Sequence, residues 1–197
     1  MNNIYVINGH EPYSFSPGNL NAELVSRTAS LLGERGYHVE CLKVTDPWQN
    51  EQEVEKHLWA DVVVLQFPVN WMGVPWSLKR YIDLVYTAGI GTLCSGDGRS
   101  REDLAKQYGG GGLLQGKKYM LSATFNAPES AFNDASQQFF RGKNADDLFW
   151  PIHLTYEFLA MRALPSFVCY DVMKNPQIEN DFDRLEQHLI AHFPVKK

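Results

Sequence analysis

A loop rich in hydroxyl and amide side chains follows the first apolar segment of the chain. Residues 9–21, "GHEPYSFSPGNLN", carry Ser14, Ser16 and Asn19 just before a helical pattern begins. Backbone N–H groups at a helix N-terminus are free to bind an anion, and small polar side chains around them suit a phosphate. An ordinary capped helix start has the same composition. The glycine patterns of dinucleotide-binding and Walker-type loops are absent, so both interpretations stay open.

Two tryptophans occupy a second loop, "PVNWMGVPW" at residues 68–76. Loops ordinarily run over the surface and are polar, so broad apolar side chains in this one need a reason. Trp71 could stack on a planar ligand, because aromatic rings commonly line such sites. Trp76 follows Pro75 at the start of a helical pattern, and we expect it to pack inward.

A third loop, "TFNAPES" at residues 124–130, supplies Thr124, Asn126 and several backbone N–H groups. Such donors can approach the rim of a heteroaromatic ring and stabilise the negative charge that develops when the ring is reduced. An ordinary Asn–Ala–Pro turn would have the same residues, so this alternative also stays open.

Apolar segments that alternate with helical patterns must position these loops. Strands are predicted at residues 4–8, 38–44, 61–67, 117–125 and 164–172, and helices at 20–36, 50–60 and 76–86, from 151, and around 182–189. Residues 126–149 are predicted to be irregular. Continuous apolar strands are typical of a parallel sheet that is buried on both faces. The sequence therefore predicts an α/β fold with a flavodoxin-like, doubly wound, five-stranded parallel sheet of order 2-1-3-4-5 and helices on both faces.

This topology predicts where the three loops meet. In a doubly wound sheet, ligands bind beyond the carboxyl ends of the strands, at the point where the strand order reverses. Residues 9–19, 67–75 and 124–135 would lie there. A phosphate-type loop, an aromatic surface and a loop of hydrogen-bond donors together match a flavin nucleotide.

Four segments of the chain resemble one family. They are "INGH…SPGNLN", "LWADVVVLQFPVNWMGVPWSLKRYIDLVY", "GTLCSGDGR" and "YGGGGLLQGKKYMLSATFNAP". The chain is similar, nearly end to end, to the modulator of drug activity B proteins, which are NADPH:quinone reductases of the flavodoxin-like fold and distant relatives of DT-diaphorase. The resemblance implies bound FAD, NADPH as the hydride donor, a quinone substrate, and a homodimer with the flavin near the subunit interface.

The resemblance also implies positions for the cofactor. The FAD diphosphate and adenine would lie along Ser16, Pro17, Gly18, Asn19, Leu20, Asn21, Ala22 and Glu23. The isoalloxazine would lie against Pro68, Val69, Asn70, Trp71 and Met72, with Thr124, Phe125, Asn126 and Ala127 along its other rim, and Tyr108 would reach in as a further contact. Val69 and Asn70 stand where close relatives are expected to have glycine and an aromatic residue, so stacking at position 70 would be weaker. DT-diaphorase has a Tyr/His pair after its fourth strand, but residues 126–142 contain neither residue type, and no catalytic acid is assigned.

The reaction that the resemblance implies is ping-pong, two-electron reduction. Hydride would move from nicotinamide C4 to flavin N5, and then from N5 to a menadione-like quinone. The same flavin could reduce azo or nitro compounds, and a flavin-binding electron carrier is a second class of protein that fits the pattern. The preference for NADPH over NADH depends on the resemblance alone, because no arginine for the 2′-phosphate is evident in the sequence.

Composition sets further limits. A net charge of −5 with no basic run argues against nucleic-acid binding. No apolar run is long enough to span a membrane, no secretory leader is evident, and the three cysteines are widely spaced, so we expect a cytoplasmic protein with reduced thiols. Residues 1–197 are predicted to form one domain with an excursion at about 87–116. This excursion is the natural element to mediate the dimerisation that the family resemblance implies. The glycine run 109–112 is interpreted as a hinge.

One histidine pair invites a metal interpretation. His188 and His192 are four residues apart in the last predicted helix, a spacing that can bind zinc. No acidic third ligand is evident beside them, and we expect no metal site.

Overall fold

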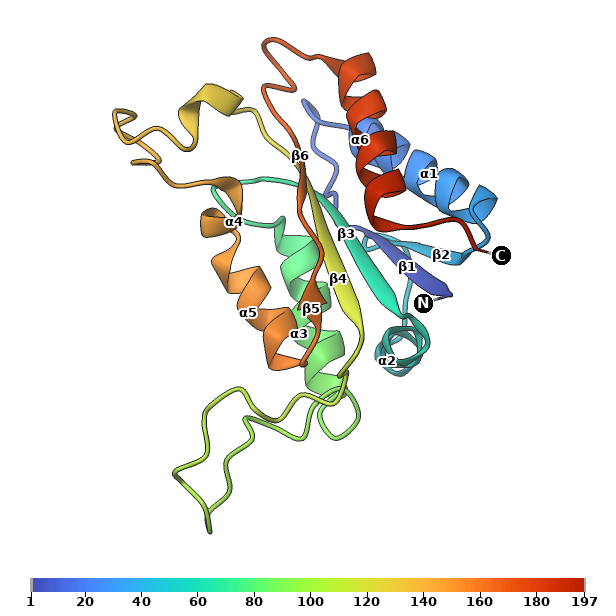
Figure 1. Cartoon of the computed structure of the whole chain (residues 1–197), viewed down its shortest axis with the longest axis vertical. Coiled ribbons are helices and arrows are strands. Elements are labelled where there is room, and N and C mark those ends of the chain that lie inside the picture. The colour runs from blue at the N-terminus through green and yellow to red at the C-terminus, as the bar shows by residue number, and fades with distance from the viewer. Residues whose placement is uncertain (1, 197) are drawn as a thin grey trace.

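A computed structural model describes residues 2–196 of the chain. Its elements in chain order are β1 (Asn3–Asn8), α1 (Asn19–Glu34), β2 (His38–Lys43), α2 (Asn50–Trp59), β3 (Val62–Pro68), α3 (Trp76–Ala88), β4 (Lys118–Thr124), the 3-10 turn η1 (Glu129–Ala131), α4 (Ala145–Leu148), α5 (Trp150–Phe158), β5 (Arg162–Ala163), β6 (Phe167–Cys169) and α6 (Ile178–His192). The strands form a six-stranded sheet of order β2-β1-β3-β4-β5, and β6 also pairs with β4 (Figure 1). Every strand pair is parallel. The predicted doubly wound fold and its 2-1-3-4-5 order are confirmed.

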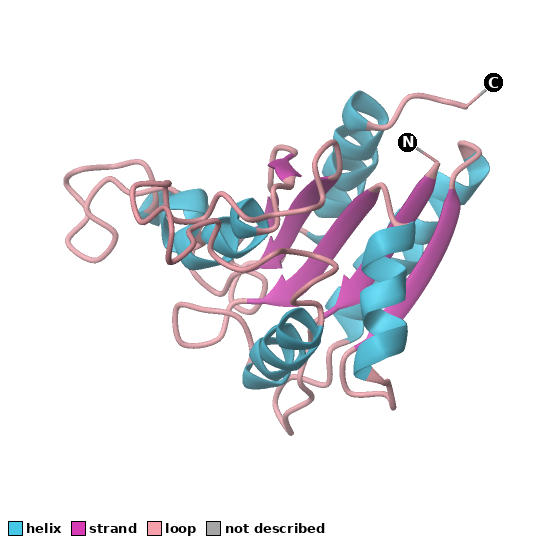
Figure 2. Ribbon diagram, turned by 90° about the horizontal axis from the view of Figure 1, so that it is seen from below, coloured by secondary structure: helices cyan, strands magenta, loops and turns pink. Residues whose placement is uncertain are grey.

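Alternate residues of the central strands build two cores. Val63 and Leu65 of β3 pack with α2, α3 and α5, whereas Val62 and Val64 of the same strand pack with α1 and α6. Figure 2 shows helices on both faces of the sheet. Successive side chains of a strand point to opposite faces, so a strand that is covered on both sides must be apolar throughout.

The predicted fifth strand, at residues 164–172, is shorter than expected. The structure has two short strands instead, β5 before Pro165 and β6 after it, and both pair with β4. Because proline has no N–H group to donate to a neighbouring strand, Pro165 interrupts the ladder. Residues 126–149 are also more regular than expected, since α4 begins there with a reciprocal capping box between Asn144 and Asp147.

The segment between α3 and β4 forms a loop with no regular helix or strand, and Figure 1 shows it extending away from the sheet. Backbone hydrogen bonds from Ser95 N to Gly111 O (2.7 Å) and from Leu113 N to Leu93 O (2.9 Å) tie its two arms together. A Cβ atom on Gly111 would lie 2.3 Å from the carbonyl oxygen of Gly96. The glycine run that was interpreted as a hinge is therefore, at Gly111, a close crossing of two backbones.

The helices of this fold were compared with the length and apolarity of a membrane-spanning helix. Within residues 2–196, none of the helices has the length and apolar character needed to cross a bilayer.

Candidate functional site

The loop after β1 ends in an open helix N-terminus. Gly9 N donates to Gln66 O (2.8 Å), and reciprocal backbone bonds between Tyr13 and Ser16 (3.0 and 2.9 Å) close a tight turn. The first backbone bond of α1 runs from Ala22 N to Gly18 O (2.9 Å). No side chain in the described part of the chain caps this end of α1. The first N–H groups of α1 are therefore available to an anion, as the phosphate interpretation requires.

A buried histidine packs against this loop, next to Ser16 and Gly18. His10 is 1% exposed, and its Nε2 lies 3.4 Å from Ser16 Oγ. Gly18 has φ of 94°, and a Cβ atom on it would lie 2.4 Å from His10 Nδ1, so no other residue fits there without displacement. Burial, assisted by the charge of Lys43, lowers the pKa of His10. His10 is a site residue that the sequence interpretation missed, because its position after a strand gives no sign of its burial.

The loop after β3 forms a strained turn. Asn70 and Gly73 exchange backbone hydrogen bonds of 2.9 and 3.0 Å. Between them, Trp71 and Met72 have φ of 47° and 64°, in the left-handed region. This conformation costs a side-chain-bearing residue roughly 1 kcal/mol or more, and such strain clusters at functional sites. The turn holds Trp71 outward, 99% exposed, where a planar ligand could reach its ring.

Trp76 does not pack inward as expected, since it is 60% exposed. The buried apolar stripe of α3 begins at Leu78 and continues through Tyr81 and Val85. Trp76 precedes Leu78 by two residues, or about 200° of helical rotation, and so faces away from the sheet. The prediction failed because a position in the first turn of a helix does not set the direction of the side chain.

The residues of the loop after β4 that were expected along the other rim of the isoalloxazine differ in exposure. Phe125 is 2% exposed, its ring lies 5.1 Å from that of Phe132, and its N–H donates to Cys169 O (2.8 Å). The side chain of Phe125 therefore packs in the core, and its backbone N–H is already paired. Asn126 is exposed and Ala127 is half-buried, so these two residues present the surface of the loop.

A buried chain of polar side chains connects the three loops. Ser122 Oγ donates to Gln66 Oε1 (2.6 Å), Gln66 Nε2 donates to Asn21 Oδ1 (2.8 Å), and Asn21 Nδ2 donates to Thr124 Oγ1 (3.3 Å). All four residues are at most 5% exposed. In addition, Val69 N donates to Thr124 O (2.9 Å). The amide of Asn21, which was expected to contact the diphosphate, is thus committed to protein partners.

The remaining predicted residues lie at the same edge of the sheet. Ser16, Gly18, Leu20, Pro68, Val69 and Asn70 are half-buried, whereas Pro17, Asn19, Ala22, Glu23 and Met72 are exposed. Glu23 pairs with Arg27 at 2.8 Å along the outer surface of α1. The predicted meeting of the three loops is what the topology produces, because β1, β3 and β4 are parallel neighbours whose carboxyl ends share one edge.

Tyr108 is far in the structure from the other residues predicted to bind the cofactor. Its ring is 5.8 Å from that of Phe158, at the end of α5, and it is 72% exposed. Shortly after Phe158 the chain enters β5, where Arg162 pairs with Lys118 at the start of β4. Tyr108 is therefore near the amino ends of the strands, whereas the three loops are at the carboxyl ends. Within one chain it is not brought to the other predicted residues.

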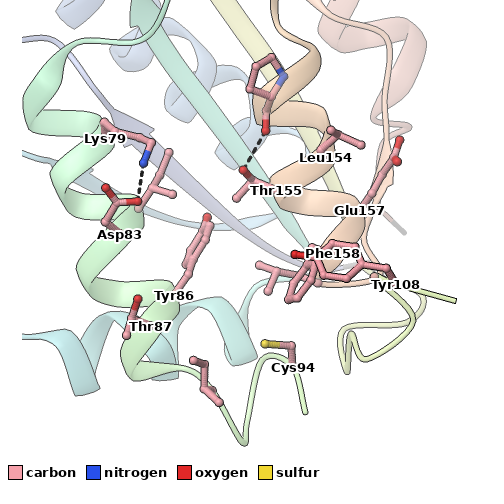
Figure 3. Close-up of a pocket in the computed structure, with 15 residues that line it drawn as sticks. Lys79, Asp83, Tyr86, Thr87, Cys94, Tyr108, Leu154, Thr155, Glu157 and Phe158 are labelled. Carbon is pink, nitrogen blue, oxygen red and sulfur yellow. Dashed lines mark hydrogen bonds and ion pairs between the residues drawn. The ribbon is translucent and has the colours of Figure 1, made fainter. Parts of the chain in front are cut away.

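A groove of about 740 Å³ lies between α3, α5 and the segment that carries Tyr108 (Figure 3). Its lining is mainly apolar and includes Tyr86, Cys94, Leu154 and Phe158. None of the residues that line this groove belongs to the three loops, so it is distinct from the site that the sequence predicted. Cys94 lies in its wall and is 3% exposed.

The histidine pair considered as metal ligands, His188 and His192, lies in α6. His188 Nε2 hydrogen-bonds to Pro165 O (3.0 Å), and its ring lies 4.7 Å from that of His192. No group of three or more potential metal-binding side chains occurs within residues 2–196.

A doubly wound parallel sheet of order 2-1-3-4-5 is the topology of the flavodoxin-like class of α/β proteins. The family model for the flavodoxin-like fold matches residues 2–192, and the chain belongs to that family.

Known proteins narrow this assignment. NADPH:quinone oxidoreductase MdaB of Haemophilus influenzae is 42% identical over 187 residues, which cover 95% of this chain and 97% of that protein. The chain is therefore a member of the modulator of drug activity B group, as the sequence resemblance indicated. Among solved structures, a Klebsiella pneumoniae protein assigned as a quinone reductase aligns with a TM-score of 0.77 at 22% identity and covers 100% of this chain and 86% of its own. General stress protein 14 of Treponema denticola, solved in complex with FMN, aligns with a TM-score of 0.65 at 17% identity over 97% and 99% of the two chains. At these identities the two structures support the fold alone.

Proposed function

We propose that this protein is an NAD(P)H:quinone oxidoreductase that uses a bound flavin, with FAD as the cofactor and NADPH as the donor. The observation that carries the proposal is the 42% identity with an NADPH:quinone oxidoreductase over nearly the whole chain. The open N-terminus of α1 and the outward Trp71, which share one edge of the sheet, are the features such a cofactor requires.

The residues at this edge suit the chemical groups of a flavin nucleotide. The uncapped N–H groups of α1, with Ser16 beside them, would hold the diphosphate. The turn from Pro68 to Met72 would support the isoalloxazine on one side, and Asn126 with Ala127 would line its other rim. A bound flavin supplies hydride transfer, in which it accepts hydride from NADPH and passes it to a quinone.

Two residues of the predicted set take different roles in this proposal. The side chains of Asn21 and Phe125 are committed within the protein, so they would shape the site rather than contact the cofactor. FAD rather than FMN, and NADPH rather than NADH, depend on the family resemblance. A cytoplasmic location, the absence of nucleic-acid binding and a single domain over residues 1–197 stay predictions.

A homodimer completes this proposal. Tyr108, expected to contact the flavin, is at the opposite end of the sheet from the three loops. A second copy of the chain would have to bring its Tyr108 to the flavin of the first. The apolar groove between α3 and α5, with Ile90 at 61% exposure beside it, offers a surface that such a dimer would cover.

Cofactor identity is tested directly on the purified protein. The flavin is released by heat, separated by chromatography and compared with FAD and FMN standards, and apo protein is titrated with each. We expect FAD in the released fraction and tighter binding of FAD. Binding of FMN alone would contradict the FAD assignment, and a colourless protein that binds neither would contradict the whole proposal. An electron carrier would bind flavin but would not be reduced by NADPH.

A further inference from the structure

The buried polar chain beneath the three loops has a direction. Each link has one donor and one acceptor, running from Ser122 through Gln66 and Asn21 to Thr124. The amide group of Gln66 accepts at its oxygen and donates at its nitrogen, and the amide of Asn21 repeats this order. An amide has distinct donor and acceptor ends, so reversing one link requires turning both amides over.

The last member of the chain retains a free donor. Thr124 Oγ1 accepts from Asn21 Nδ2, and within residues 2–196 its own hydroxyl hydrogen has no acceptor in the structure. A threonine hydroxyl donates one hydrogen bond and accepts up to two. Because Asn21 points its donor inward at Thr124, the O–H of Thr124 is left to point elsewhere. Thr124 is the final residue of β4, directly before the loop that presents Asn126.

Position in the sheet explains why this chain lies where it does. Val62, Val64 and Gln66 share one face of β3, and Met120, Ser122 and Thr124 share the corresponding face of β4. On both strands this face changes from apolar to polar at the carboxyl end. Buried polar groups are costly unless they are paired, so the three hydrogen bonds of this chain favour one arrangement of its side chains and leave the Thr124 hydroxyl as its one open end.

We propose that Gln66 is a positioning residue that, through Asn21, fixes the Thr124 hydroxyl as a hydrogen-bond donor to the bound flavin nucleotide. This inference rests on the proposed function. The acceptor is an oxygen of the nucleotide that lies between the N-terminus of α1 and the loop after β4. Gln66 itself, at 2% exposure, does not touch the ligand. Its effect on binding is transmitted by the amide of Asn21.

A double-mutant cycle separates this role from a purely structural one. Gln66→Met keeps the length of the side chain and removes its hydrogen bonds, and Thr124→Val keeps the shape of threonine and removes the hydroxyl. Each change alone is expected to weaken FAD binding about tenfold, and the double variant is also expected to bind about tenfold more weakly than the wild type. Thr124→Ser, which keeps the hydroxyl, should bind within about threefold of the wild type.

FAD affinity is measured by fluorescence titration of the apo proteins, whose folding is checked by circular dichroism and thermal unfolding. An additive loss of about a hundredfold in the double variant, or wild-type affinity in Gln66→Met, would overturn the inference. If Gln66→Met does not fold, Ser122→Ala takes its place in the same cycle with the same expectations. Wild-type protein that binds no flavin would overturn the proposed function, whereas wild-type binding with an additive cycle would overturn this inference alone.

Discussion

Trp71 combines exposure with backbone strain, and the two can be separated by substitution. Trp71→Ala removes the ring and keeps a side-chain-bearing residue at φ of 47°, whereas Trp71→Gly removes both the ring and the strain. We expect the apo Gly variant to be more stable than the Ala variant by about 1 kcal/mol. Chemical denaturation of the two apo proteins measures this difference, and equal stabilities would contradict the strained turn.

The same pair of variants tests the contact of Trp71 with the cofactor. Both should bind FAD more weakly than the wild type, by about tenfold, because both lack the ring that would stack on the isoalloxazine. Flavin titration measures the two affinities. Unchanged affinity in both variants would exclude a stacking role for Trp71.

Replacing two glycines of α1 and its N-cap by alanine is expected to change the stability of the protein in opposite directions. At Gly18, φ is 94° and a Cβ would lie 2.4 Å from His10, so Gly18→Ala should destabilise the protein by roughly 2 kcal/mol and weaken flavin binding. Gly33, near the end of α1, has open space around it. Gly33→Ala should therefore stabilise the protein by about 0.5–1 kcal/mol. Thermal unfolding of both variants measures the contrast, and a destabilised Gly33→Ala would contradict it.

Helices α2 and α3 enclose a buried ionisable group whose effect depends on pH. His57 is 0% exposed, its Nδ1 lies 2.8 Å from Glu53 O, and its Nε2 lies 3.2 Å from the hydroxyl of Tyr86. Burial lowers the pKa of His57 to about 4. The hydrogen bond to the backbone of Glu53 and the charge of its carboxylate oppose this shift, whereas the charges of Lys117 and Lys56 add to it. The Glu53 carboxylate also accepts from Tyr5 and Tyr81, so it is held in place.

The sign of the effect follows from the direction of this shift. As the pH is lowered, His57 takes up a proton near its ordinary pKa of 6.5 in the unfolded chain, but only near pH 4 in the folded chain. Folding stability from this group is therefore complete above about pH 6.5 and falls as the pH decreases toward 4, by roughly 3 kcal/mol in total. His57→Gln should show a shallower decline over this range. Denaturation at a series of pH values measures it, and parallel profiles for the two proteins would refute the assignment.

At the scale of elements, the apolar runs and helical spacing were sufficient to predict the sheet order and the edge where the loops meet. Other features depend on which side chains the fold places together. Gln66 is a single polar residue in an apolar run, and nothing in the sequence shows that Asn21 would pair with it. The exposure of Trp76 and the division of the last strand at Pro165 likewise depend on packing against neighbouring strands and helices.

At the scale of the whole molecule, the position of Tyr108 motivates the proposal that two chains form each site. The resemblance placed this residue at the flavin, yet the structure places it beside Phe158 near the amino ends of the strands. The sequence could not distinguish a contact within one chain from a contact between chains. In the homodimer that we propose, each site would contain residues of both protomers.

Complementation between two defective variants tests that arrangement. Trp71→Ala and Tyr108→Ala homodimers should each have reduced quinone reductase activity. After mixing, unfolding and refolding, a heterodimer would contain one site that carries both changes and one site that carries neither. We expect the mixture to regain up to about a quarter of the wild-type activity above the two parents. Light scattering that shows a monomer, or a mixture no more active than its parents, would contradict a shared site.

We propose that the edge formed by the three loops binds a flavin that passes hydride from NADPH to a quinone. An anaerobic titration of the purified holoprotein tests it most directly. NADPH is added stepwise while the visible flavin absorbance is followed, and menadione is then added to the reduced protein. We expect the colour to be lost with one equivalent of NADPH per flavin and restored with one equivalent of menadione. A flavin that NADPH leaves oxidised, or that menadione does not reoxidise, would contradict it.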